Sequence, residues 1–113
     1  SLLKSEKDRN SFSPLIKSIQ RILSEKRKED LYSDQFNAAY PGYLEYLTRT
    51  YPELTTSDLK LCSFLRMNLN TKEIAEIMGL SVRSIESRRY RLRKKLNLSK
   101  EEDLVSNLIS LKY

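Results

Sequence analysis

The stretch NTKEIAEIMGLSVRSIESRRYRLRKKL, residues 70–96, decides how this chain folds. Asn70 or Thr71 can cap a first helix, and Gly79 can end it in the left-handed conformation that helix ends favour. Ser81 can then cap a second helix after a connection of only two or three residues. Two amphipathic helices with so short a connection must cross steeply, so the stretch predicts a helix-turn-helix.

The second helix of this pair is strongly basic and has a narrow apolar side. Residues 83–96 carry seven basic side chains and one acidic side chain. At about 100° per residue, Ile85, Leu92 and Leu96 fall together on one side, so we expect them to be buried. A helical hairpin whose charges only keep it soluble is the alternative, but charge concentrated on one element favours a polyanionic partner.

Helices are also predicted on both sides of the pair. Thr55 and Asp58 have the spacing of a capping box, which opens a helix with a buried face. Ser99 and Glu102 have the same spacing and predict the start of a last helix. The apolar face of this last helix is wide for its length, so core packing and a dimer surface are evenly supported. Its candidate dimer residues are Leu104, Val105, Leu108 and Ile109.

The first 52 residues are predicted to form a helical extension. We expect the charged opening segment to be either frayed or the end of an upstream element. A helix should then start at Ser13-Pro14 and break near Asp30. The apolar residues of this helix, at positions 15–23, need to be buried. Packing on the rest of the domain and self-association are evenly supported.

Charge and composition narrow the class of function. The net formal charge is +6, and residues 53–98 hold 10 basic and 5 acidic side chains, so the excess is concentrated there. The 113 residues include no His, one Cys and two Gly, which leaves neither a metal-ligand cluster nor a glycine-rich phosphate loop. Cys62 lies in an apolar run and is expected to be a small buried residue. We therefore predict that the chain is not an enzyme and uses no cofactor or metal.

No apolar stretch of about 18 residues and no signal-peptide pattern occur in the sequence. We accordingly expect no membrane contact by this chain. A membrane-surface role for the basic helix would need a broad apolar face, and its apolar side is narrow.

Residues 54–98 resemble the LuxR/NarL-type helix-turn-helix, through the segments LTTSDLKLCSFL, NTKEIAEIMGLS and VRSIESRRYRLRKKLNL. Asn68 stands where that family often has glycine, and Arg88 where it often has histidine. A wider resemblance, over residues 32–112, is to the DNA-binding end of Bacteroidetes sensor-regulators. The residues that fall at the family's spacing are Thr55, Lys72, Glu73, Ile74, Ala75, Ser81, Ile85, Lys95 and Leu96.

This resemblance implies an all-α, four-helix LuxR-like domain over residues 53–113, preceded over residues 1–52 by a helical linker from an upstream signalling module. It implies a bacterial transcription regulator of the two-component type that binds double-stranded promoter DNA, commonly as a homodimer. We expect the sensor domains to lie outside this chain. The expected location is cytoplasmic, or the cytoplasmic end of a larger membrane-anchored regulator. The alternatives are a sigma-factor-like promoter-binding module and a non-DNA protein-interaction module with a basic helix.

The third helix of the domain, the basic one, is expected to read the major groove. Arg83 lies near its N-terminus and is the first choice for reading guanine through paired donors. Side chains on its flanks and at helix starts are expected to hold phosphates. The predicted base-reading residues are Arg83, Glu86, Ser87 and Tyr90. The predicted phosphate-binding residues are Thr71, Lys72, Ser81, Ser84, Arg88, Arg91, Lys94 and Lys95.

Overall fold

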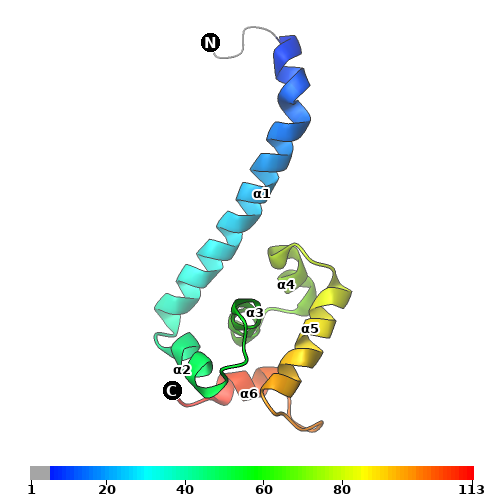
Figure 1. Cartoon of the computed structure of the whole chain (residues 1–113). Helices are drawn as coiled ribbons and strands as arrows, with labels where there is room; N and C mark the ends of the chain where they lie inside the picture. The colour runs from blue at the N-terminus through cyan, green and yellow to red at the C-terminus, as the bar shows by residue number, and fades with distance from the viewer. Residues whose placement is uncertain (1–5) are drawn as a thin grey trace.

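The computed structural model describes the backbone of residues 6–113, and the side chains of residues 14–24 and 27–113. Over this range the chain forms helices joined by turns, with no strand, which confirms the expected all-α class. Figure 1 shows one long helix that projects from a compact group of shorter ones. The helices are α1 (Glu6–Ala39), α2 (Tyr43–Thr50), α3 (Thr56–Arg66), α4 (Thr71–Met78), α5 (Val82–Lys95) and α6 (Leu104–Ser110).

Helix α1 is longer than the sequence predicts. It runs without interruption from Glu6, through Pro14 and the charged run near Asp30, so the predicted start and break are both wrong. The run SEKRKED consists largely of Lys, Arg and Glu, which are good helix formers, so charge alone does not end the helix there. The expected frayed segment is helical from Glu6 on, and residues 1–5 lie outside the described residues.

The C-terminal part of α1 belongs to the same core as the helix-turn-helix. Phe36 of α1 and Tyr43 of α2 are buried, and their rings meet edge to face with centroids 5.4 Å apart. Tyr32 contacts Phe64 of α3 in the same way, at 6.0 Å. Apolar contacts thus cross residue 52, where the sequence suggested a boundary between extension and domain.

Local signals position most helix ends. Thr55 and Asp58 form the predicted capping box of α3, and Asn70 and Glu73 form another at the start of α4. Gly79 ends α4 with a φ of 66°. These caps satisfy backbone N–H groups that an isolated helix end leaves free, so the starts of α3 and α4 are well defined.

The start of α6 differs from the prediction. The backbone N–H of Ser99 donates to the Glu102 carboxylate at 3.3 Å, but this bond closes a turn and no helix begins there. Helix α6 begins at Leu104, with Asp103 as the cap that accepts from the backbone N–H of Ser106. The resulting helix has only seven residues, Leu104–Ser110.

Helix α6 is attached to α2 by a buried hydrogen bond. The Tyr43 hydroxyl donates to the Leu108 carbonyl oxygen at 2.6 Å. That carbonyl lies in the last turn of α6, where carbonyls have no partner within the helix. Burial raises the pKa of the Tyr43 hydroxyl well above its usual value, so the group remains a donor.

The same packing changes the candidate dimer surface on α6. Leu104 and Leu108 are buried in the chain's own core, so they are not available on its surface. Val105 is half-buried, and Ile109 remains exposed. A dimer surface on α6 is therefore limited to these last two residues.

Replacing Tyr43 with Phe should lower the free energy of unfolding by about 1–2 kcal/mol, because the Leu108 carbonyl loses its buried donor. Urea unfolding followed by circular dichroism measures the change. Tyr90→Phe, at an exposed position, is the control and should change stability by less than about 0.5 kcal/mol. Equal stability of the two variants would contradict this role for the Tyr43 hydroxyl.

Candidate nucleic-acid interface

Helices α4 and α5 form the predicted pair. Asn70 caps α4, and the Ser81 hydroxyl caps α5 by accepting from the backbone N–H of Ser84 at 3.1 Å. Ile74 and Ala75 are buried on the inner side of α4, and the small Ala75 permits the close approach of α5. Figure 1 shows that α5 lies on the far side of α3 from α1, so no other helix of the described chain covers its outer side.

Three apolar residues hold α5 on the core. Ile85, Leu92 and Leu96 are buried, as their spacing predicts. Apart from the exposed Val82 at its start, the rest of the helix carries charged and polar side chains and Tyr90. These three buried residues form a narrow apolar seam. Because α5 has so few apolar residues, the seam sets the orientation of the helix about its own axis and turns the opposite face outward.

The four predicted base-reading residues lie together on this outward face. Arg83, Glu86, Ser87 and Tyr90 are all exposed, and with Arg91 they line one open depression. A guanidinium, a carboxylate and two hydroxyls thus converge on one surface. Such groups can donate to or accept from base edges, and the structure brings them together without testing that role.

Tyr90 is the bulkiest side chain on this face, and 61% of its surface is exposed to solvent. The amino group of Lys94 lies 4.4 Å from the centre of its ring, one helical turn further on. This cation–π contact holds the ring across the helix surface and leaves the Lys94 charge beside it. The two residues therefore present a positive charge and an apolar plane at the same place.

The cations among the predicted phosphate-binding residues fall into two groups. Arg88 and Lys95 contact α3: the Arg88 Nη1 donates to the Ser57 hydroxyl at 2.9 Å, and the Lys95 Nζ lies 2.6 Å from the Asp58 carboxylate. A phosphate would have to compete with these internal partners. The remaining exposed cations of this group are Lys72, Arg91 and Lys94.

Three predicted phosphate-binding residues lie at the starts of α4 and α5. Thr71 accepts from the Arg89 Nη1 at 3.4 Å, and Ser81 caps α5, so both hydroxyl oxygens have an internal donor. The Ser84 backbone N–H is used by that same cap. The phosphate role of these residues remains a prediction.

Two arginines that the sequence did not single out connect α5 to its neighbours. Besides the Arg89 contact with α4, the Arg93 Nη2 donates to the Ser99 carbonyl oxygen at 2.7 Å. At about 100° per residue both lie within roughly 80° of Ile85, which was the signal in the sequence for a position beside the core. Their charge is therefore directed away from the outward face.

The Lys95–Asp58 pair also fixes the start of α3. Burial opposes ionisation of Asp58, but hydrogen bonds from Lys95 and from Thr55 outweigh it and lower the pKa of the carboxyl group. One carboxylate thus closes the capping box and binds α5 to α3. The Lys95–Asp58 pair therefore holds α5 at its C-terminal end.

Other reactive groups are few in the part of the chain that the structure describes. Burial raises the pKa of the Cys62 thiol to about 12, so it stays protonated at neutral pH. No group of three or more possible metal ligands occurs among the described residues. No helix in this part of the chain combines the length and the apolar character that a membrane span needs.

Comparison with known families agrees with the geometry. Residues 67–96, which begin directly after α3 and contain α4 and α5, match the family model described as Sigma-70, region 4. No curated protein and no solved structure matches the chain. The matched segment is a helix-turn-helix of the DNA-binding type, a fold related to the LuxR-type domains that the sequence resembles.

Replacing Asp58 with Asn should lower the free energy of unfolding at about pH 7 by about 1–2 kcal/mol, because the Lys95 pair is lost and the cap is weakened. The pKa of Asp58 is lower in the folded chain than in the unfolded chain. Its stabilisation is therefore present above the ordinary pKa, about 3.9, and is lost as the pH falls through the folded value.

Urea unfolding of both proteins from about pH 7 to about pH 2.5 measures this effect, and the difference between them should shrink in acid. Asp34→Asn, at an exposed position of α1, is the control. A difference that does not change with pH would show that the charge of Asp58 is not responsible.

Proposed function

We propose that this chain is a sequence-specific, double-stranded DNA-binding module of a transcription regulator and that it has no catalytic activity. The observation that carries the proposal is the outward face of α5, where Arg83, Glu86, Ser87 and Tyr90 converge beside free cations. The match of α4 and α5 to a DNA-binding helix-turn-helix family supports it. In this proposal α5 enters the major groove.

Each part of the outward face has a proposed task. Arg83, in the first turn of α5, reads guanine through its paired donors. Tyr90 and Lys94 contact bases and backbone further along the groove. Arg91, with Lys72 at the start of α4, holds phosphates and supplies affinity for any sequence.

We further propose that the module is the output end of a signal-responsive, LuxR-like regulator with upstream sensor domains in the cytoplasm or at the membrane. The resemblance of residues 54–98 supports this reading. A sigma-type promoter-binding module is the second candidate, and the match over residues 67–96 favours it. Selection from a random duplex pool distinguishes them, since a dimeric regulator selects two related half-sites and a single module selects one.

Replacing Arg83 with Ala should reduce discrimination at one base pair by about 1–3 kcal/mol and leave affinity for unrelated duplexes nearly unchanged. Competition titrations with the selected site and with single-base variants measure this. Arg93→Ala is the matched control, because Arg93 lies on the same helix and donates to Ser99 instead. An equal loss for every sequence would assign Arg83 to the backbone.

Replacing Arg91 with Gln should weaken binding to all duplexes alike and reduce the slope of log affinity against log salt by about one. Arg93→Gln makes the same change in charge on the other side of α5 and should alter the slope less. Titrations at several salt concentrations measure both slopes. If neither the variants nor the original chain binds duplex DNA at low salt, the proposed function is wrong.

A further inference from the structure

The free part of α1 carries an apolar stripe that nothing in the described structure covers. Figure 1 shows this part of α1 projecting beyond the other helices. The stripe has a helical period, and its members are 41–61% exposed. An isolated helix gains little stability from its own hydrogen bonds, so such a stripe normally packs against another surface. The stripe residues are Leu15, Ile16, Ile19, Ile22 and Leu23.

The stripe does not face the chain's own core. Tyr32, Phe36 and Glu29 mark the side of α1 that packs on the other helices, through the core and through the Glu29–Lys60 ion pair. At about 100° per residue this side is rotated by roughly 110° from Ile19, the centre of the stripe. A second molecule can therefore reach the stripe without displacing the core.

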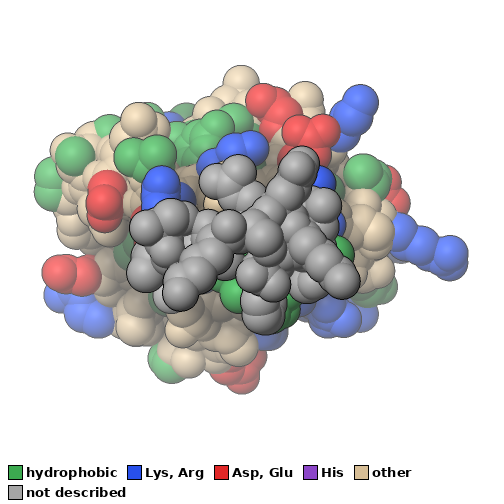
Figure 2. Space-filling view, turned by 90° about the horizontal axis from the view of Figure 1, so that it is seen from above, with side chains coloured by type: hydrophobic (Ala, Val, Ile, Leu, Met, Phe, Trp, Pro, Cys, Tyr) green, Lys and Arg blue, Asp and Glu red, His purple; other side chains and the backbone are tan. Residues whose placement is uncertain are grey.

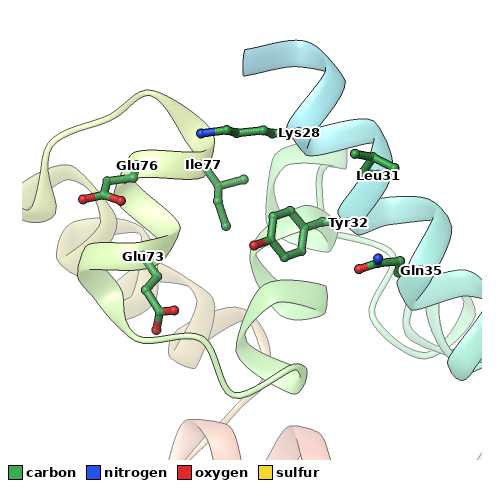
Figure 3. Close-up of a pocket in the computed structure, with 7 residues that line it drawn as sticks. All are labelled: Lys28, Leu31, Tyr32, Gln35, Glu73, Glu76 and Ile77. Atoms are coloured by element: carbon green, nitrogen blue, oxygen red, sulfur yellow. The ribbon is translucent and has the colours of Figure 1, made fainter. Parts of the chain in front are cut away.

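The groove between α1 and α4 lies on a different side of α1 from the stripe. Figure 3 shows Lys28 and Tyr32 of α1 directed toward α4, and Ile77 of α4 directed toward α1. Lys28 and Leu31 lie roughly 120–180° from the centre of the stripe. Helix α4 therefore leaves the stripe uncovered. Figure 2, seen from the end at which α1 projects, shows hydrophobic side chains at the surface among charged ones.

We propose that the stripe pairs with the same stripe of a second copy of this chain, in a parallel two-helix interface. Leu15, Ile19 and Ile22 have the alternating four- and three-residue spacing of a coiled-coil seam. The stripe is flanked by the uncharged Ser18 and Gln20. Within residues 15–23, no charged residue therefore lies next to the stripe on the helix surface.

The charges of this part of α1 are on the opposite side. Lys17 and Arg21 lie roughly 160° from the centre of the stripe, in the position that solvent-exposed charges take in a helix pair. An acidic partner bound to the stripe could pair with these cations only if they lay next to the stripe, and they lie on the opposite side of the helix. A second copy needs only the apolar surface, so the distribution of charge favours self-association.

The exposed area indicates a weak dimer. Five half-exposed aliphatic side chains present on the order of 400 Å² on each helix, the size of the largest apolar patch on a typical monomer, which often has a function. Two copies would bury on the order of 800 Å², below the size of a standard stable interface. We therefore expect the isolated chain to dimerise only at high protein concentration.

The parallel orientation rests on the proposed function. In a parallel pair both helix-turn-helix units lie at the same end of the α1 pair, where two α5 helices can reach one duplex. An antiparallel pair would place them at opposite ends. Self-association itself does not depend on DNA binding, so it is tested without DNA.

Sedimentation equilibrium from about 1 µM to about 1 mM should show the mass rising from one chain toward two. Ile22→Lys should abolish this rise. Leu31→Lys is the matched control, because Leu31 is 57% exposed against 60% for Ile22 and lies outside the stripe. Circular dichroism checks that both variants keep their helices. A chain that stays monomeric, or an equal loss of dimer in both variants, would overturn the proposal.

Disulfide cross-linking tests the orientation. The two variant proteins Leu15→Cys and Ile22→Cys, one of which carries a mass tag, are mixed and oxidised. The native Cys62 is buried and does not react. A parallel pair gives cross-links within each variant, 15 to 15 and 22 to 22. Cross-links only between the two variants would show an antiparallel pair and overturn the parallel arrangement, while leaving DNA binding to its own test.

Discussion

The arrangement of this molecule depends on the burial of Ile85 and Leu92 of α5 and of Leu96, which directly follows the helix. The helix carries many charges, and these three side chains are the apolar contact that holds it on α3 and α4. Their burial selects which side of the helix faces outward. The hydrogen bonds of Arg88, Arg89, Arg93 and Lys95 then fix its position along the core.

The fold of the helix-turn-helix could be predicted from the sequence because its signals are local. A capping box, a glycine in the left-handed conformation and a second cap lie within a few residues of the ends that they determine. The start of α1, its unbroken course past Asp30 and the start of α6 could not be placed in this way. Near Asp30 the charged residues are also good helix formers, and at Ser99 a capping pattern closes a turn instead.

The candidate site could be predicted in part, for a similar reason. The outward residues follow from the helical period, which brings Arg83 and Tyr90 to one face. The partners of Arg88 and Lys95 lie in α3, more than thirty residues away in the sequence, and composition does not indicate them. The period does place both side chains nearer to the seam than to the outward face, a signal that a count of basic residues overlooks.

The uninterrupted course of α1 has a mechanical consequence. The same helix carries the free stripe and, roughly two to six turns later, the aromatic residues Tyr32 and Phe36, which contact Phe64 of α3 and Tyr43 of α2. No turn or glycine separates them along α1 from Glu6 to Ala39. A rotation of the free arm about its axis would therefore turn the whole group of helices with it, and α1 can act as a rigid shaft without a hinge.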